Sequence, residues 1–294
     1  MFIPSTAAID LTPYQNALQH YPALFQPRPK DSHKGTFGTL GLIGGSIGMS
    51  GALVLAATAA IYSGCGKVWA GFQQVTLPIP FIADRPEIML AIAPQLQQRK
   101  DINAWVCGCG LGLQQDAYAV LQQQLSLQTS VPLLLDADAL ALIAHSTELR
   151  QAAIAYPTLI ITPHPSEAAR LLNTSTAEIQ ANRMVAVQQL AMQFKAIAVL
   201  KGHQTLIANP NGNVQQNNSG NAGLATAGSG DVLCGMIGAL LAQGVSAEEA
   251  AYCGVWLHGV AADVLRSLYV GEIGMLAGEI APTARWLRNR LMAS

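Results

Sequence analysis

Short apolar runs that alternate with longer helical patterns are the feature that most constrains the fold of this chain. Beyond about residue 30, such runs occur at 39–43, 69–73, 104–107, 132–135, 158–161 and 197–200. Each is followed by glycine, aspartate or a turn, which is typical of buried parallel strands. The alternation therefore predicts a layered α/β fold, in which helices cover a mostly parallel sheet.

The segment after the run at 197–200 departs from this alternation. A second strand-like run at 204–208 leads into Asn211-Gly212, and a third short run follows at 214–216. An Asn-Gly pair is a strong signal for a tight hairpin turn. The sequence therefore predicts that antiparallel strands are added to the sheet at this point.

One large hydrophobic core is expected from the length and composition. The chain has 294 residues, of which 51% are hydrophobic and 11% are charged. We predict a single domain at 30–294. An N-terminal arm at 1–29, which carries five prolines, is expected to pack on the domain surface or on a neighbouring copy. The low charged fraction and the mean hydropathy of +0.30 indicate further burial between copies, that is, a homo-oligomer.

Several classes of partner are excluded by the charge and hydropathy pattern. The formal net charge is −1, whereas nucleic acids and anionic membranes require a strongly basic surface. The longest apolar stretches, at 51–62 and 232–242, are shorter than the roughly 18 to 20 residues that span a bilayer. The N-terminus lacks the basic start and apolar run of a signal peptide. We therefore expect a cytoplasmic protein without a nucleic-acid or membrane partner.

The cysteines and histidines show no metal-binding pattern. Five cysteines without framework spacing predict reduced, buried thiols. Cys107 and Cys109 are separated by one residue, whereas zinc and redox motifs have two. We therefore expect no structural metal site.

The segment at 218–244 carries the strongest chemical signal. Small, flexible residues end in Gly228-Ser229-Gly230-Asp231 and lead directly into an apolar helix. The N–H groups and the dipole at a helix N-terminus attract an anion, and glycines allow its close approach. A carboxylate there would repel a phosphate, so Asp231 makes sense if it takes a proton from a group being phosphorylated. The alternative is that Asp231 is only the N-cap of the helix.

The loop after the run at 39–43 allows two interpretations. Gly44-Gly45-Ser46-Ile47-Gly48 matches the G-x-S-x-G of a hydrolase nucleophile elbow, with Ser46 as nucleophile. That elbow needs the helix to begin at the serine, whereas further small residues delay it here. The competing interpretation is a glycine loop that faces a ligand, with Ala52 opening the helix. No Walker A lysine and serine follow, so the loop is not a P-loop.

Other strand ends carry further candidate groups. A short glycine-rich loop follows at 108–112, and Asp138 either caps the next helix or faces a ligand. His164 is held between two prolines, while Lys201 and Thr205 place a cation and a hydroxyl at the mouth of the hairpin. Lys201 is equally compatible with an ordinary surface lysine. Since the carboxyl ends of parallel strands share one edge, all these groups are expected to line one cleft.

Six segments carry these motifs in order, from about residue 33 to the C-terminus: HKGTFGTLGLIGGSIGMSGA, GCGLG, LLLDADAL, ITPHPSE, VLKGHQTLIA and NAGLATAGSGDVLCGMIGALLAQG. Together they resemble the ADP-dependent NAD(P)H-hydrate dehydratases of the ribokinase-like superfamily. The resemblance implies a three-layer α/β/α sandwich with a mostly parallel central sheet and a few antiparallel edge strands. A small-molecule kinase of the same superfamily, acting on a hydroxymethylpyrimidine or thiazole alcohol, is the alternative.

Membership of that family would imply the repair of hydrated nicotinamide cofactors. ADP phosphorylates the hydroxyl of (6S)-NADHX or NADPHX, phosphate then leaves, and NADH or NADPH is restored with release of AMP. Phosphate leaves far more readily than hydroxide, so the nucleotide is consumed by the chemistry. Mg²⁺ is expected on the phosphates, held largely through water and phosphate oxygens.

The resemblance also implies roles for individual positions. Asp231 would be the base near the hydroxyl, and the N–H groups of Gly228, Ser229 and Gly230 would stabilise the transferring phosphoryl group. The remaining expected contacts are Lys201, Gly202, His203, Gln204, Thr205 and Gly230 for the nucleotide, and Ala52, Gly110, His164 and Asp231 for the hydrate.

Three positions depart from the commoner pattern of the family. Ser229 stands where threonine is usual and keeps the hydroxyl. Cys109 replaces a usual proline and Ser166 a usual glycine, and both changes can alter loop rigidity. Many relatives carry an epimerase domain ahead of this region, which the short arm cannot be. The resemblance therefore implies a separate NAD(P)H-hydrate epimerase, and it favours a homotetramer.

Overall fold

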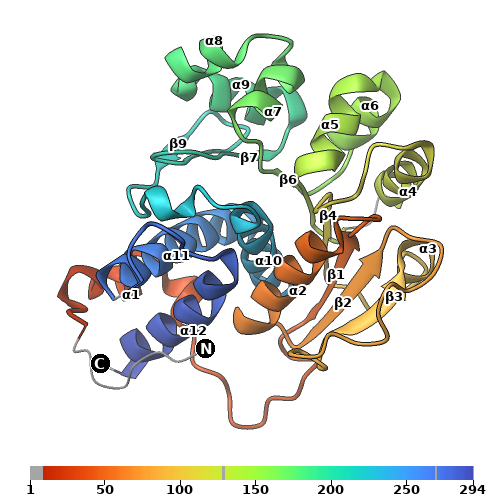
Figure 1. The fold of residues 1–294 in the computed structure, drawn as a ribbon. Helices are drawn as coiled ribbons and strands as arrows, with labels where there is room; N and C mark the ends of the chain where they lie inside the picture. The colour runs from red at the N-terminus through yellow and green to blue at the C-terminus, as the bar shows by residue number, and fades with distance from the viewer. Residues whose placement is uncertain (1–8, 128–129, 269, 294) are drawn as a thin grey trace.

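The computed structural model describes residues 9–127, 130–268 and 270–293, and within these ranges a nine-stranded sheet forms the centre of the molecule (Figure 1). The strand order is β3-β2-β1-β4-β5-β6-β7-β8-β9. Strands β1 to β7 are parallel, and β8 and β9 are antiparallel. The bounds are β1 (Thr39–Gly44), β2 (Lys67–Phe72), β3 (Met89–Ile92), β4 (Ala104–Cys107), β5 (Leu133–Leu135), β6 (Leu159–Ile161), β7 (Ile197–Leu200), β8 (Leu206–Ala208) and β9 (Val214–Gln216).

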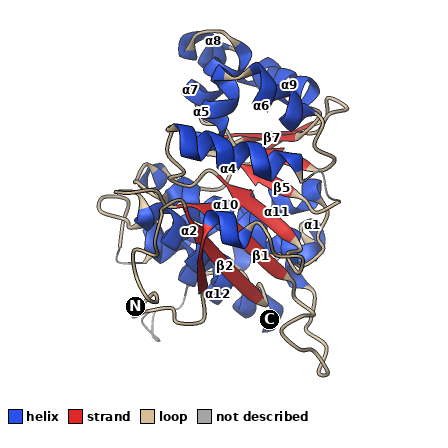
Figure 2. Ribbon diagram, turned by 90° about the vertical axis from the view of Figure 1, so that its right-hand side faces the viewer, coloured by secondary structure: helices blue, strands red, loops and turns tan. Residues whose placement is uncertain are grey.

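Helices cover both faces of the sheet, as Figures 1 and 2 show. One face packs against α2 (Ser50–Tyr62), α10 (Ser229–Ala242), α11 (Ala247–Ser267) and α12 (Ala277–Ala293). The other packs against α3 (Ala93–Leu96), α4 (Gln115–Ser126), α5 (Ala137–His145), α6 (Thr147–Ile154), α7 (Pro165–Leu172), α8 (Thr176–Ala181) and α9 (Arg183–Phe194). The predicted three-layer architecture with a mostly parallel sheet and antiparallel edge strands is confirmed.

The strands separate two hydrophobic cores because successive side chains point to opposite faces. Val106 of β4 belongs to the core beneath α2 and α10, whereas its neighbours Trp105 and Cys107 belong to the core on the opposite face. All four residues of β4 are buried. This double burial explains why the parallel strands have continuous apolar sequences.

Of the arm predicted at 1–29, residues 1–8 lie outside the described residues. The rest forms η1 (Thr12–Tyr14), α1 (Ala17–His20) and η2 (Pro22–Phe25). Leu24 is fully buried in the core that contains α11 and α12. The ring of Tyr21 stacks on Trp256 of α11, with centroids 4.6 Å apart.

The chain changes direction across the sheet at β1. It runs outward from β1 to β2 and β3 and then returns to the other side of β1 as β4. Such a switch point opens a crevice at the carboxyl ends of the strands. There the Gly45 N–H donates to the Cys109 carbonyl at 3.0 Å, and the Ser46 N–H donates to the Gly110 carbonyl at 2.7 Å. The two glycine-rich loops predicted separately are thus joined.

Strand β3 was not expected from the sequence. It is a four-residue edge strand, mostly only half buried, so its apolar pattern is short and weak. Among the described residues, no helix is both long enough and apolar enough to cross a bilayer.

Candidate functional site

The N-terminus of α10 forms the centre of the site. Gly228 is the N-cap with φ +88°, and a β-carbon there would lie only 2.4 Å from Cδ1 of Leu55. Glycine is therefore required both for the backbone conformation and for the contact with α2. Asp231 is the third residue of α10. The alternative that Asp231 is the N-cap of this helix is wrong.

The three N–H groups predicted to bind an anion, those of Gly228, Ser229 and Gly230, lie at the start of α10. In the first turn of an α-helix the N–H groups have no partner within the helix. The Ser229 N–H donates to the Thr226 carbonyl over 3.4 Å, and the Ser229 hydroxyl donates to the Leu224 carbonyl at 2.8 Å. Ser229 thus orders the loop that leads into α10.

Asp231 has the properties of a base that works near neutral pH. Burial raises its pKa to about 6, a hydrogen bond from Cys109 lowers it in part, and the charge of Asp136 raises it further. The side chain is only partly exposed. A carboxyl group with this pKa can accept a proton and release it again under ordinary cellular conditions.

Lys201 is the cation next to Gly228, Ser229 and Gly230, which together are called the anion loop. Its Nζ lies 2.5 Å from Oδ1 of Asp136 and 4.0 Å from Oε2 of Glu167, and its side chain is 18% exposed. Burial alone would lower the pKa of Lys201, but the surrounding acidic groups, Asp136 foremost and Glu167 among them, together outweigh burial and the pKa is raised. A β-carbon on Gly230 would lie 3.5 Å from this Nζ. Lys201 is therefore a fixed, charged group next to the α10 N-terminus and not an ordinary surface lysine.

His164 begins α7 and is tied to Glu167. Nδ1 of His164 accepts the Ser166 N–H at 3.2 Å, and Nε2 lies 3.2 Å from Oε1 of Glu167. The Glu167 carboxylate in turn accepts the His164 N–H at 2.7 Å, which completes a capping box. Burial and the charge of Lys201 lower the pKa of His164. Its half-exposed ring is thus a neutral group with a fixed orientation.

Gly110 and Ala52 lie together at the switch point. Gly110 has φ +62°, and a β-carbon there would be 2.8 Å from Cβ of Met49 and 3.2 Å from Cβ of Ala52. The two residues predicted to contact the hydrate are therefore neighbours. Helix α2 begins at Ser50 and not at Ser46, which is incompatible with a hydrolase elbow, so that interpretation is wrong.

Asp138 does not cap α5, contrary to one of the two predictions for it. The N-cap is Asp136, and Asp138 accepts the Gly112 N–H at 2.8 Å. Asp138 therefore holds the glycine loop that follows β4. Between the two aspartates, Ala137 has φ +47°, a conformation that L-residues seldom adopt.

The segment predicted to hold the nucleotide forms the turn between β7 and β8. Gly202 and Gln204 have φ +129° and +54°, and the Thr205 hydroxyl donates to the Gly202 carbonyl at 3.0 Å. The Lys201 N–H donates to the Pro163 carbonyl at 2.9 Å. This bond joins the turn to the His164 segment. His203 is exposed, and no role for it follows from its surroundings.

Four groups at the site were missed in the sequence: Asp136, Glu167, Arg183 and His258. His258 of α11 faces the Ser229 carbonyl, with Nε2 3.0 Å from the oxygen, and burial lowers its pKa to about 4. Nη2 of Arg183 donates to the Leu200 carbonyl at 3.2 Å. Asp136 and Glu167 stood in the quoted segments LLLDADAL and ITPHPSE without an assigned role. Arg183 and His258 lay outside these segments, and their partners come from distant elements.

This geometry has known counterparts. A family model described as NAD(P)H-hydrate dehydratase matches residues 40–284. The chain belongs to the NAD(P)H-hydrate dehydratase family. It is 58% identical over 280 residues to the ADP-dependent (S)-NAD(P)H-hydrate dehydratase of Neisseria meningitidis, and the match covers 95% of this chain and 94% of that protein.

Other members of the family extend the comparison. The bifunctional NAD(P)H-hydrate repair enzyme Nnr of Escherichia coli is 38% identical over 90% of this chain, which spans 50% of that protein. The ADP/ATP-dependent NAD(P)H-hydrate dehydratase of Bacillus subtilis, co-crystallised with ATP and Mg²⁺, superposes with a TM-score of 0.81 and 30% identity. That match covers 93% of this chain and 96% of the Bacillus chain. The ribokinase-like fold predicted from the sequence is thereby confirmed.

Proposed function

We propose that this member of the NAD(P)H-hydrate dehydratase family converts (6S)-NADHX and NADPHX back to NADH and NADPH at the expense of ADP. The observation that carries the proposal is the position of Asp231. A partly buried carboxyl group with a pKa of about 6 lies in the first turn of α10, where the helix dipole attracts a phosphate. A base beside a phosphate site is what phosphorylation of a hydroxyl requires.

The first step is phosphoryl transfer to the hydrate. Asp231 takes the proton of the hydrate hydroxyl, and the hydroxyl oxygen forms a bond to the β-phosphorus of ADP. The bond from that phosphorus to the bridging oxygen breaks, which releases AMP. The N–H groups of Gly228 and Gly230 stabilise the charge on the phosphoryl oxygens. In the second step the ring nitrogen donates electrons, the carbon–oxygen bond breaks and phosphate leaves. The proton on the neighbouring ring carbon then passes to solvent, and the electrons of its C–H bond form the ring double bond. The dihydropyridine is restored.

The nucleotide is proposed to lie over the turn at 201–205. Lys201 presents a positive charge that Asp136 and Glu167 hold in place, close to Gly230. The Arg183 guanidinium lies against Gly202, where a β-carbon would be 2.6 Å from its Nη1. His203, Gln204 and Thr205 complete the proposed contact surface. Asp138 and Asp231 supply oxygen donors of the kind that Mg²⁺ accepts. Mg²⁺ bound with the nucleotide would neutralise phosphate charge.

The hydrated nicotinamide is proposed to enter between the switch-point loops and α7. Gly110 and Ala52 are small neighbours there, so a ring can approach the base closely. His164 offers an imidazole of fixed orientation at the opposite side. Asp231 would contact this substrate as well as the transferring group.

A direct assay tests the proposal. The purified protein is incubated with NADHX, ADP and Mg²⁺, and the absorbance of the reduced nicotinamide is followed while AMP and phosphate are quantified by chromatography. We expect recovery of NADH with one AMP and one phosphate per turnover, and a parallel reaction with ATP measures the nucleotide preference. A stable phosphorylated product would indicate a small-molecule kinase instead. Failure of both nucleotides to restore absorbance would refute the dehydratase.

The biological setting is proposed on the same basis. The catalytic domain is taken as 30–294, and the protein as a homotetramer in the cytoplasm that works with a separate NAD(P)H-hydrate epimerase. The low charged fraction of 11% supports self-association. Bifunctional relatives named as repair enzymes support cooperation with an epimerase. Light scattering should give four times the chain mass of 30.9 kDa.

A further inference from the structure

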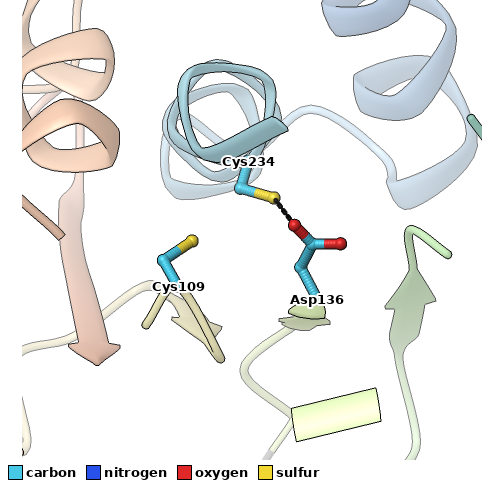
Figure 3. Close-up of side chains that lie close together, drawn as sticks. All are labelled: Cys109, Asp136 and Cys234. Carbon is cyan, nitrogen blue, oxygen red and sulfur yellow. Dashed lines mark hydrogen bonds between the residues drawn. The ribbon is translucent and has the colours of Figure 1, made fainter. Parts of the chain in front are cut away.

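Two thiols and one carboxylate converge beneath the first turn of α10. Cys109 follows β4, Asp136 follows β5 and Cys234 lies on α10, and Figure 3 shows their side chains gathered at one point. The three potential ligand atoms lie within 4.8 Å of one another, and Sγ of Cys234 is 3.2 Å from Oδ2 of Asp136. All three side chains are buried. The dehydration chemistry proposed above uses neither thiol.

We propose that Cys109, Asp136 and Cys234 form a binding site for a soft divalent cation such as Zn²⁺ or Cd²⁺. Thiolate sulfur selects these ions over Mg²⁺, which prefers oxygen. A tetrahedral zinc ion with Zn–S bonds of about 2.3 Å holds two sulfurs about 3.8 Å apart. The thiols therefore need to move by no more than about 1 Å. Three protein ligands leave one open position for water or another ligand.

The surroundings of Asp136 suit a ligating carboxylate. Lys201 Nζ contacts Oδ1 at 2.5 Å, whereas Oδ2 accepts the Cys234 thiol at 3.2 Å. One oxygen is thus available to a metal while the other keeps an orienting partner, as is usual for ligands in metal sites. Exchange of two thiol protons for one divalent cation leaves the net charge of this buried site unchanged.

Occupation of the site exchanges protons for the metal. Each S–H bond of Cys109 and Cys234 is replaced by a sulfur–metal bond, and two protons pass to solvent. The hydrogen bond with Cys234 and burial raise the pKa of Cys109, and burial raises the pKa of Cys234.

A bound metal should also inhibit the enzyme. Cys109 hydrogen-bonds to Asp231, and Cys234 follows Asp231 by three residues on α10, so both lie on the same side of the helix. A metal ion here would replace the thiol proton of Cys109 and so remove the hydrogen bond by which this thiol orients the Asp231 carboxylate. This consequence rests on the proposed function, whereas the metal site itself does not.

Cadmium binding to the reduced wild-type protein tests the site directly. Cd²⁺ is titrated into metal-free protein, and the ultraviolet thiolate-to-cadmium charge-transfer band is recorded. We expect saturation at one Cd²⁺ per chain with the intensity of two thiolates, competition by Zn²⁺, and no effect of excess Mg²⁺. A wild-type protein without this band, or with a band that Mg²⁺ abolishes, overturns the proposal without any reference to dehydratase activity.

Alanine variants locate the ligands. Cys109→Ala and Cys234→Ala should each abolish the two-thiolate band. The controls Cys65→Ala and Cys253→Ala remove buried cysteines outside the cluster and should retain it. Persistence of the full band in Cys109→Ala, which is decisive even if Cys234→Ala does not fold, refutes the assignment. With NADHX and ADP as substrates, Zn²⁺ should inhibit the wild type and the controls but not Cys109→Ala.

Discussion

Asp231 is placed where its charge is useful for catalysis and unfavourable for folding. The carboxyl group needs to be ionised to accept a proton, yet burial raises its pKa from 3.8 to about 6. Between these values the folded protein binds more protons than the unfolded chain, so stability falls as the pH rises through this window. The penalty is fully present above about pH 6. Functional sites commonly carry such a cost.

Replacement of this carboxylate should separate activity from stability. We expect Asp231→Asn to lower turnover by roughly 100-fold to 10,000-fold, because a base is lost, while ADP binding survives. The variant should also gain about 1–2 kcal/mol of unfolding free energy at pH 8. This gain is smaller than the whole rise in the pKa of Asp231 implies, because solvent screens a partly exposed group. Urea unfolding and steady-state kinetics measure both. Asp116→Asn, in the first turn of α4, is the control. Unchanged turnover in Asp231→Asn would exclude Asp231 as the base.

The Lys201–Asp136 pair should behave as a buried ion pair. Lys201→Met leaves the 3%-exposed Asp136 side chain without its cation, which should cost about 3–5 kcal/mol of unfolding free energy. Adding Asp136→Asn removes the orphaned charge and should restore most of that stability but not ADP affinity. Chemical unfolding and calorimetric titration with ADP distinguish the two effects. The control Lys67→Met breaks a surface pair with Asp101 and should cost about 1 kcal/mol or less. Equal losses in Lys67→Met and Lys201→Met would contradict this account.

At the scale of elements, α11 fixes the loop that leads into α10. Asp263 accepts the Gly220 N–H at 2.8 Å and the Asn221 side-chain amide at 3.0 Å. The Ser219 hydroxyl donates to the Trp256 carbonyl at 3.1 Å. A β-carbon on Gly259 would lie 2.3 Å from Oγ of Ser219 and 2.8 Å from its carbonyl carbon. The helix glycine is thus explained by the close approach of this loop.

Gly259→Ala should therefore impair nucleotide use more than helix propensity would suggest. We expect the KM for ADP to rise by about tenfold, equivalent to roughly 1.4 kcal/mol, because displacement of Ser219 moves the anion loop. Gly278→Ala in α12 is the matched control, since the nearest atom to its β-carbon is 3.9 Å away. That control should gain about 0.5–1 kcal/mol of unfolding free energy. The same KM in both variants would show that α11 does not position the loop.

The elements that the sequence predicts well are those specified locally. Buried strands such as β4 and β5 are continuous apolar runs, and the loop before α10 has a composition that suits few other structures. Strand β3 is short and mostly half buried, so its apolar sequence is too brief to distinguish it from the loop before it. In Asp136-Ala137-Asp138 the residue that begins the helix depends on an unusual backbone angle at Ala137. Pairings such as Lys201 with Asp136 exist only after distant strands are aligned in the sheet.

At the scale of the whole molecule, the site lies where elements from both faces of the sheet meet. The switch point joins the β1 and β4 loops, α10 belongs to the core of one face, and α5 and α7 belong to the core of the other. The sheet holds both cores in register, so the catalytic groups depend on the stability of both faces. The N-terminal arm contributes to one of these cores, because Leu24 and Phe25 are buried with α11 and α12.

The arm should therefore be part of the cooperative fold. Leu24 is fully buried and Leu18 is 41% exposed, although both belong to the same short segment. Leu24→Ala should lower the unfolding free energy by about 2–5 kcal/mol, whereas Leu18→Ala should change it by about 0.5 kcal/mol or less. Urea unfolding followed by both tryptophan fluorescence and circular dichroism should show one coincident transition in each variant. Similar small effects of the two substitutions would mean that the arm is docked on the surface and unfolds separately. A large effect confined to Leu24→Ala, with coincident probes, would place the arm within the core that supports α10 and its catalytic turn.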